Sequence, residues 1–389
     1  MPDRLTHRLG EKGMILFTTL AILLILVTVG IASRIMVRND YRVLTNLRGG
    51  TEAFYIAAAG LEWSKHEIVR AATFPPAPAN RTENFAAGTF AVTFVTPVVT
   101  SPLSAKIIVR SVGTLRNASH TLQAQLTKDY DLADAAIALR GNLAQVNLSS
   151  NGIFISGADH DPVTGHASAA TRPRPAISAA SDSIVDRVNQ AAAVLPTGSI
   201  DSASGVPPIA PSTYLSTSVI TQLANDLCGQ SSVIQSAVPV TGALVYENQT
   251  WGSRSVPQLR CIDGLASAGD GVTLAGTVSG AGILIVRNAD LILAGTLRWE
   301  GMVIVTGSEV GLKVTVSSSK EVLGGMILNE TGHPSNSTAV LDIQGNLRIL
   351  FSRQALSQAS TLISASILNQ TYSSLPSLIT QNYWRSVTP

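Results

Sequence analysis

The chain is short of the residues that most often carry chemistry. Its 389 residues include two cysteines, six histidines and 13% charged residues, whereas an average globular protein has about 25% charged residues. So few sulfur and imidazole ligands exclude a zinc cluster or an iron–sulfur site, and the two cysteines form no CxxC redox pair. The net charge of +2 gives no support to nucleic-acid binding.

The sequence also lacks the motifs of common enzymes. It contains no GxSxG, no GxxxxGK[ST] and no HExxH, and Gly280-Ala281-Gly282 lacks the third glycine of a dinucleotide-binding loop. Strand-rich repeats can carry the groove of a polysaccharide-cleaving enzyme, but the repeat region offers few acids, namely Asp290, Glu300 and Glu309. We therefore predict a protein that is not an enzyme and needs no cofactor.

What the chain does have is apolar sequence, concentrated near its start. Hydrophobic residues make up 45% of the chain, enough to exclude a fully disordered protein. Residues 14–33 read MILFTTLAILLILVTVGIAS and carry no charge. A helix of 20 residues is about 30 Å long, the thickness of a bilayer core. The sequence therefore predicts a transmembrane helix here.

The same helix is expected to continue to residue 70. No proline lies between Arg34 and Arg70, and Phe54, Ala57, Leu61 and Ile68 keep helical spacing, which suits packing against a globular domain. Arg34, Arg38 and Arg42 stand four residues apart on one helical face. A stripe of this kind is typical of a solvated or phosphate-facing surface next to a membrane, and a specific acidic partner is the alternative.

A basic leader ending in Gly13, followed by an apolar helix from Met14, resembles the class III signal of prepilins. The stretch from Glu11 to Met36, together with AFYIAAAGLEWS at 53–64, resembles the PilX N-terminal domain of type IV pilus assembly proteins. The resemblance implies cleavage between Gly13 and Met14 by a membrane peptidase, which methylates the new N-terminus. It also implies assembly with other pilin or pseudopilin subunits through the helix.

The sequence departs from that family at the fifth position of the mature chain. Ordinary pilins carry a glutamate there, which is thought to pair with the amino terminus of a neighbouring subunit, and this chain has Thr18. A charge in an apolar filament core is costly unless it is paired. Thr18 removes that pairing, as in many PilX-like proteins and tip subunits, and therefore favours a minor or tip subunit over a major pilin.

Strands are expected after the helix. Residues 71–84 are a proline-rich break, and GTFAVTFVT, AKIIVRSVGTL and SHTLQAQL within 88–128 follow at hairpin-like spacing. This predicts a small antiparallel sheet packed on the helix.

An internal repeat points to a solenoid further along. VTLAGTVSGAGILIVRN (272–288) matches LILAGTLRWEGMVIVTG (291–307) at an offset of 19, and looser copies lie at 322–328 and 341–350. A period near 20 with β-branched strands and glycine corners predicts a parallel β-solenoid, and an antiparallel meander is the alternative. The fragment 137–157 has the same pattern and is interpreted as the first coils of the same solenoid.

The predicted fold class is therefore α+β: a long N-terminal helix, a small antiparallel sheet, and a β-solenoid-like region with an insertion rich in alanine, serine and proline. The expected segments are a leader (1–13), the helix (14–70), a small β domain (71–130), first coils (131–158), the insertion with loops and short helices (159–270), solenoid repeats (271–352) and a tail (353–389).

Two residue pairs remain as candidate sites. Cys228 and Cys261 are expected to form a disulfide if the body is periplasmic, and to be two buried thiols in a cytosolic protein. The loop GADHDPVTGH places Asp159 and Asp161 two residues apart. A plain turn with Asx-type hydrogen bonds is the favoured interpretation, and a calcium site is the alternative.

The function expected from these observations is that of a minor pilin-like subunit of a type IV pilus or a type II secretion pseudopilus. The chain would lie in the inner membrane with one span and a periplasmic body, or outside the cell in a pilus fibre. Its expected partners are other pilin subunits, prepilin peptidase, the membrane and a surface or polymer ligand, with no nucleic acid. The alternative is an uncleaved membrane-anchored scaffold whose solenoid binds a ligand.

Overall fold

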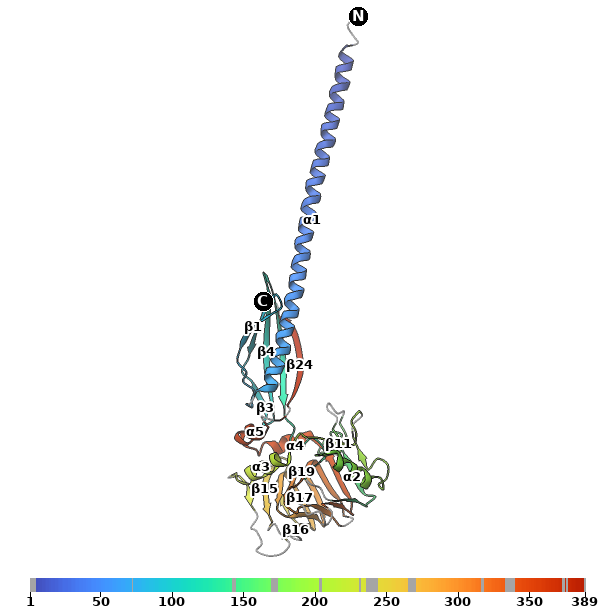
Figure 1. Ribbon diagram of the computed structural model, residues 1–389, viewed down its shortest axis with the longest axis vertical. Coiled ribbons are helices and arrows are strands. Elements are labelled where there is room, and N and C mark those ends of the chain that lie inside the picture. Colours follow the sequence, from blue (N-terminus) through green and yellow to red (C-terminus); the bar gives the residue numbers. More distant parts are fainter. Residues whose placement is uncertain are drawn as a thin grey trace.

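Three parts follow one another along the longest axis of the molecule (Figure 1): a long helix, a small antiparallel sheet, and a larger body of parallel strands. This computed structural model describes residues 5–71, 73–141, 145–168, 174–202, 205–230, 232–235, 244–264, 271–315, 318–332, 340–372, 375 and 377–387. For residues 5–13, 235 and 378 it describes the backbone alone.

The first part is the helix α1 (Leu5–Arg70), which runs for 66 residues without a break. No proline interrupts it, and the backbone passes through Gly13 and Met14 as regular helix. Met14–Arg70 is long and apolar enough to cross a membrane, and none of its most apolar 18-residue window is buried inside the molecule. The helix ends at Arg70, as the proline-free stretch indicated.

The small sheet is antiparallel, and its strand order is β1-β2-β4-β5-β24, with β3 paired to β4. Its last strand comes from the C-terminal end of the described chain, about 250 residues after its neighbour β5. The body of parallel strands is therefore inserted into this sheet between β5 and β24. The strands are β1 (Arg81–Phe85), β2 (Gly88–Phe94), β3 (Val98–Ser101), β4 (Ser104–Leu115), β5 (Ala118–Asp129) and β24 (Leu378–Val387).

The C-terminal half of α1 packs on one face of this sheet. Strand β4 alternates strictly between buried and more exposed side chains, as expected when one face meets a helix and the other meets water. Close approach depends on two glycines: a Cβ on Gly113 of β4 would lie 2.2 Å from the carbonyl oxygen of Ala53, and one on Gly60 would lie 2.3 Å from Ser111 Oγ. The buried apolar residues of this contact include Ile56, Ala57, Leu61 and Ile68 from the helix and Phe90, Val92, Ile107, Val109, Leu122 and Leu126 from the sheet.

The larger body consists of two parallel sheets. One contains β6 (Ile137–Gly141), β8 (Ile153–Ser156), β9 (Ile177–Ala179), β10 (Ile200–Asp201), β11 (Ile209–Pro211), β12 (Ile234–Gln235), β14 (Thr250–Trp251), β15 (Gln258–Asp263), β17 (Thr277–Arg287), β19 (Thr296–Gly307), β21 (Lys320–Glu330) and β23 (Leu347–Phe351). The other contains β7 (Val146–Leu148), β13 (Leu244–Glu247), β16 (Gly271–Ala275), β18 (Asp290–Leu293), β20 (Leu312–Val314) and β22 (Leu341–Ile343). From β15 to β23 the chain alternates between the two sheets and stacks each turn on the next. The long helix, the antiparallel sheet and this β-rich body confirm the predicted fold class.

The repeat in the sequence corresponds to this stacking. Residues related by the offset of 19 are direct neighbours: Leu274 faces Leu293, and Gly282 faces Gly301. The looser copies continue the stack, because Gly301 faces Gly324 in β21 and Leu312 faces Leu341 in β22. Each turn thus supplies matching apolar side chains to one continuous interior.

Glycines bend the three longest strands of this body at positions that face one another across the sheet. Gly282, Gly301 and Gly324 have φ values of 123°, 131° and 142°, a region that other residues avoid. Each of them would place a Cβ about 2 Å from backbone carbonyl oxygen of the adjacent coil, as between Gly301 and Gly282 at 2.1 Å. On their outer sides β17 and β21 change neighbours at this bend: β17 pairs first with β14 and then with β15, and β21 pairs first with β23 and then with β6. Strand β19 lies between them and pairs with both along its length.

The two halves differ in burial. In β19 the first residues alternate between exposed and buried, whereas Met302–Thr306 are all buried. β17 shows a similar change, and β21 is buried from Val322 to Glu330. The helices α3 (Thr217–Cys228) and α4 (Arg353–Ser360) pack against these strands, and they lie with α5 (Ala365–Tyr372) on the side that faces the small sheet (Figure 1). Continuous apolar runs such as GILIV (282–286, in β17) therefore indicate the strand halves that are covered on both faces.

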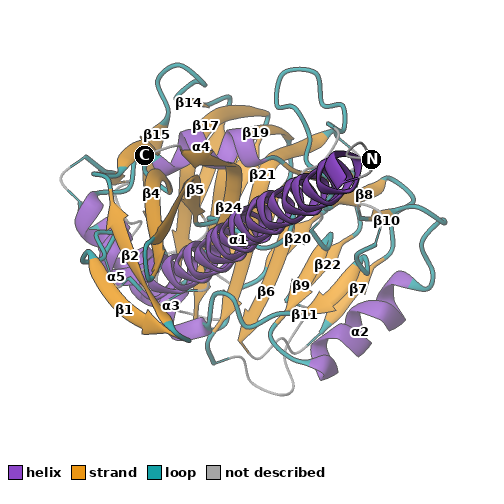
Figure 2. Ribbon diagram, turned by 90° about the horizontal axis from the view of Figure 1, so that it is seen from above, coloured by secondary structure: helices purple, strands orange, loops and turns teal. Residues whose placement is uncertain are grey.

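The order of the coils differs from the order of the sequence. Strands β6, β7 and β8 stack on β21, β22 and β23, the last repeats along the chain. The segment 159–270, expected as an insertion of loops and short helices, holds α2 (Asp182–Ala192) and α3, and it also supplies β9–β15 to the parallel sheets. Figure 2 shows α2 beside β7 and β11 at one end of the row of strands.

The glycine bend gives a direct test of this architecture. We expect Gly301→Ala to lower the free energy of unfolding by at least ~2 kcal/mol, because its φ of 131° is strained for alanine and its Cβ would meet the Gly282 carbonyl. The measurement is urea unfolding of the full chain in a neutral detergent, followed by tryptophan fluorescence.

Gly50→Ala is the matched control. Gly50 lies in α1, and a Cβ added to it would meet no atom within 4 Å, so alanine should leave stability unchanged or raise it by ~1 kcal/mol. Equal effects of the two substitutions would contradict the role assigned to the bend.

Candidate functional site

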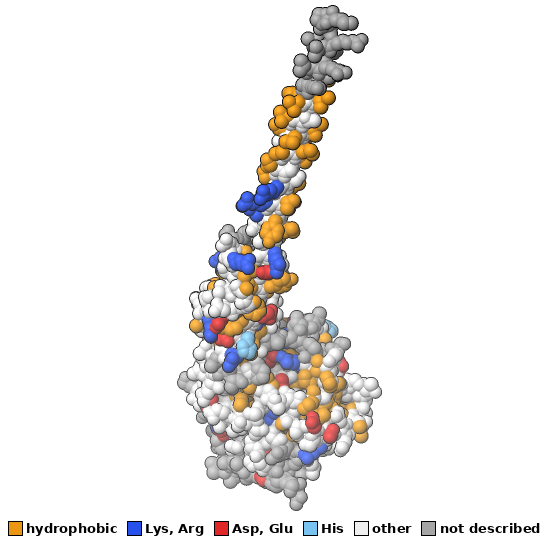
Figure 3. Space-filling model, turned by 45° about the horizontal axis from the view of Figure 1, so that its top comes forward, with side chains coloured by type: hydrophobic (Ala, Val, Ile, Leu, Met, Phe, Trp, Pro, Cys, Tyr) orange, Lys and Arg blue, Asp and Glu red, His pale blue; other side chains and the backbone are white. Residues whose placement is uncertain are grey.

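The most exposed apolar surface of the molecule is the N-terminal half of α1. Between Met14 and Leu47 the large apolar side chains are 51–72% exposed. Figure 3 shows hydrophobic side chains around this part of the helix, well above the globular parts. From Met14 to Ser33 this surface carries no charged side chain. An apolar surface of this size is not left in water, and it indicates a surface for a membrane or for other helices. These residues are Met14, Ile15, Leu16, Phe17, Leu20, Ile22, Leu23, Leu24, Ile25, Leu26, Val27, Val29, Ile31, Ile35, Met36, Val37, Tyr41, Val43, Leu44 and Leu47.

The threonine hydroxyls within this surface are satisfied by the helix itself. The Thr18 hydroxyl donates to the carbonyl oxygen of Ile15 at 3.0 Å, and Thr28 donates to Ile25 at 2.8 Å. A threonine bonded in this way adds no unsatisfied group to an apolar medium. Thr18 therefore leaves this part of the surface uncharged.

The far end of α1 is capped by a buried lysine. Lys128, on β5, is fully buried, and its Nζ donates to the carbonyl oxygens of Ile68 at 2.9 Å, Ala71 at 3.0 Å and Val69 at 3.4 Å. The last carbonyls of a helix have no partner within the helix and carry partial negative charge, so a cation is favourable there. Burial lowers the pKa of Lys128 to about 8. The cap locks the end of the helix to the sheet.

Replacing this lysine tests the cap. Lys128→Met removes three hydrogen bonds from buried carbonyls, and we expect a loss of about 1–3 kcal/mol in the free energy of unfolding at pH 7. The pKa of the lysine is about 8 in the folded chain and about 10.4 when unfolded. Between these values the unfolded chain binds more protons, so the wild type gains stability relative to the variant as the pH rises.

Urea unfolding of both proteins at pH 7, 8.5 and 10 measures this difference. It should widen toward pH 10. A difference that is constant or shrinks with pH would contradict a charged, desolvated cap, and Lys106→Met on the exposed side of β4 provides the control for an ordinary lysine.

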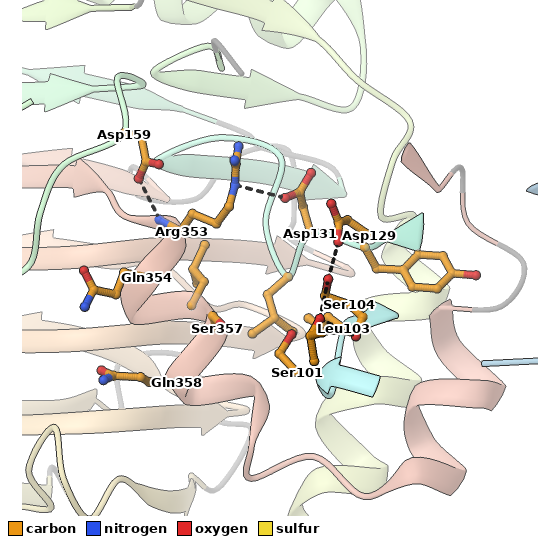
Figure 4. A pocket seen from close by; sticks show the side chains of 14 residues that line it. Ser101, Leu103, Ser104, Asp129, Asp131, Asp159, Arg353, Gln354, Ser357 and Gln358 are labelled. Atoms are coloured by element: carbon orange, nitrogen blue, oxygen red, sulfur yellow. Dashed lines mark hydrogen bonds and ion pairs between the residues drawn. The ribbon is translucent and has the colours of Figure 1, made fainter. Parts of the chain in front are cut away.

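A cavity lies where the small sheet meets the parallel body. Its volume is about 550 Å³, and it is bounded by the β3–β4 turn, the segment that leaves β5, and α4. Figure 4 shows Asp131 and Asp159 on either side of Arg353. The backbone N–H of Arg353 donates to Asp159 at 2.9 Å, and its Nε lies 3.8 Å from Asp131. Arg353 therefore connects the segment that leaves β5 with the loop that carries Asp159.

Asp159 and Asp161, the pair considered for calcium, do not point to a common centre. Asp159 caps the start of α4 as described, whereas Asp161 accepts hydrogen bonds from the backbone N–H groups of Val163 and Thr164, both at 2.8 Å. The bonds from Thr164 and Val163 lower the pKa of Asp161. Among the residues that the structure describes, no three histidine, cysteine, aspartate or glutamate side chains gather as metal ligands.

The loop that carries these aspartates instead lies against the parallel body. The carbonyl oxygen of Pro162 accepts from Arg254 at 2.9 Å and from Arg298 at 3.2 Å. These arginines belong to a ladder of ion pairs across successive coils, in which Arg298 and Arg348 both pair with Glu321, at 2.5 Å and 3.0 Å. Glu300 and Glu321 are thus engaged with arginines instead of lining an open acidic groove.

Cys228 and Cys261 are bonded to each other, with Cα atoms 5.7 Å apart. The bond connects the end of α3 to β15, and both cysteines are buried among apolar residues. It closes a loop across a sequence separation of 33 residues, and so fixes the end of α3 to β15.

Removing the bond should destabilise the chain. We expect the Cys228→Ser, Cys261→Ser double variant to lose about 3–4 kcal/mol of unfolding free energy, because a loop of this length is no longer restricted in the unfolded chain. Urea unfolding of the oxidised wild type and of the variant gives the difference. The wild type under strong reductant should match the variant, and a wild type insensitive to reductant would contradict the prediction.

Sequence reasoning missed two features of this region. The role of Lys128 depends on a contact between residues 57–60 positions apart, which no local pattern shows. The return of the C-terminal segment to the small sheet was also missed. Five of the ten residues of LITQNYWRSV (378–387) are β-branched or aromatic, and this is the signal that could have indicated a strand.

Comparison with known proteins does not identify the family of this chain. No protein-family model matches the sequence, and no curated protein matches it. Among solved structures, the chain is similar to the competence-associated pilin ComZ from Thermus thermophilus, at 12% identity over 87% of this chain and 97% of that one, with a TM-score of 0.27. A likeness this low carries no weight for the function of this chain.

Proposed function

We propose that the chain is a minor pilin-like subunit, anchored in the inner membrane by residues 14–33 with its body in the periplasm, and able to assemble through α1 into a type IV pilus or a type II secretion pseudopilus. The observation that supports this most is the division of one rigid helix. Its N-terminal part exposes apolar side chains without a charge from Met14 to Ser33, and its C-terminal part is packed on an antiparallel sheet.

That division suits two successive environments. In a bilayer, the apolar half would lie among lipid tails. In a filament, the same surface would pack beside the helices of other subunits, and Gly30, Ala32 and Ser33 would allow close backbone approach. Gly30 has no atom of its own chain within 4 Å of its Cβ position, so this part of the helix is open to a neighbour.

The remainder of the chain supports a role at a tip or surface instead of in a repeated shaft. The body of parallel strands is inserted between β5 and β24 and is much larger than the sheet that holds it. An uncleaved scaffold that presents the same body to a surface or polymer is the second candidate. The two candidates differ at Gly13, where prepilin peptidase would cut.

Mass spectrometry of the N-terminus distinguishes them. For protein purified from its native membrane, we expect a chain that starts at Met14 with one added methyl group. Gly13→Val should abolish this processing, and Gly10→Val, in the same leader, should not. A wild-type chain that still begins within residues 1–13 would contradict the pilin proposal and leave the anchored scaffold.

A further inference from the structure

Three arginines lie on one side of α1 directly after the apolar stretch. Arg34, Arg38 and Arg42 are exposed, and Figure 3 shows Lys and Arg side chains gathered on one side of the helix at its lower, free-standing part. A step of four residues rotates by about 40° beyond a full turn, so the three side chains span an arc of only about 80°. Asp40 is two residues from Arg38 and from Arg42 and therefore lies on the opposite side.

These arginines have no partner in the rest of the molecule as far as it is described. No ion pair or hydrogen bond involves their side chains within residues 14–71 and the other described segments, whereas the next arginine, Arg48, pairs with Glu52 at 2.8 Å. Three unpaired like charges within two turns repel one another. Such a stripe is favourable only where anions approach it.

The position of the stripe along the helix indicates which anions. Arg34 lies 20 residues after Met14, a distance of about 30 Å that equals the hydrocarbon thickness of a bilayer. Contact between α1 and the small sheet begins at Gly49, whose Cβ position is 3.4 Å from Ala118 Cβ. That point is about 22 Å beyond Arg34. The stripe thus occupies the gap between the bilayer core and the globular part, at and just beyond the level of the phosphates.

We propose that Arg34, Arg38 and Arg42 bind the headgroups of anionic phospholipids, such as phosphatidylglycerol, in the leaflet that faces the globular part. Guanidinium groups bind phosphate oxygens in a bidentate manner. Because the three side chains lie on one face, the binding would fix the rotation of α1 about its axis as well as its depth. The proposal rests on the insertion of residues 14–33 into the membrane, as proposed above.

Native mass spectrometry of the full chain in a neutral detergent tests this binding. The probe is an equimolar mixture of phosphatidylglycerol and phosphatidylcholine with identical acyl chains. Each arginine near a charged surface should contribute a preference of about fivefold. We expect wild type to retain phosphatidylglycerol preferentially, and the preference to fall as ionic strength rises. The Arg34→Gln, Arg38→Gln, Arg42→Gln variant should retain both lipids equally.

Arg48→Gln is the matched control and should keep the preference, because Arg48 is engaged with Glu52. Equal retention of both lipids by the wild type, or an unchanged preference in the triple variant, would overturn the proposal and favour an acidic protein partner for the stripe. Alkaline extraction of membranes separates this result from the anchoring itself. A chain that is extracted refutes the membrane anchor, and a chain that stays in the membrane without lipid preference refutes only the role of the arginines.

Discussion

The packing of the second half of α1 on the small sheet is the contact on which the rest of the molecule depends. It fixes one end of the 66-residue helix to the sheet, and such packing supplies most of the stability of helices in proteins. The small residues Ala53, Ala57 and Gly60 on the helix and Gly113 on the sheet allow close approach. Lys128 then binds the last carbonyls. With that end fixed, the apolar half projects as continuous helix, and its entire circumference is available for a membrane or for neighbours.

The same sheet also determines how the large body is held. Because the body is inserted between β5 and β24, both of its connections return to adjacent strands of one sheet. Side chains strengthen this junction on both sides: Asn369 of α5 accepts a hydrogen bond from the backbone of Phe74 at 2.8 Å, and Tyr130 packs between Phe74 and Tyr372. Burial raises the pKa of Tyr130 to about 12, so this contact stays uncharged over the pH range in which the chain would work. Two connections and a packed junction make the body move with the helix.

The parts of this architecture that depend on a local or repeated pattern of residues could be predicted from the sequence. The apolar run from Met14, the absence of proline to Arg70 and the 19-residue repeat each correspond to one element or to direct neighbours in the stack. The order of the coils could not be predicted, because apolar strands of similar length and pattern can pair at many positions of a parallel stack. Only the structure shows that β6 lies beside β21. Asp159 illustrates a further limit: spacing in a loop suggests shared ligation, whereas the actual partner, the backbone of Arg353, lies 194 residues away.

The distribution of charge follows from the same arrangement. Within the parallel body, acids and arginines pair across coils, as Glu321 does with Arg298 and Arg348, so the outer face of these coils is close to neutral. In a chain with a net charge of +2, the unpaired cations of α1 therefore stand out as the strongest local field along the free helix. An apolar surface without charge and a basic stripe at its boundary are complementary to the two layers of a bilayer, its tails and its phosphates. In the proposed role, removal from the bilayer into a filament would have to replace both sets of contacts, so the residues proposed to anchor the chain would also determine what any neighbouring subunit must offer it.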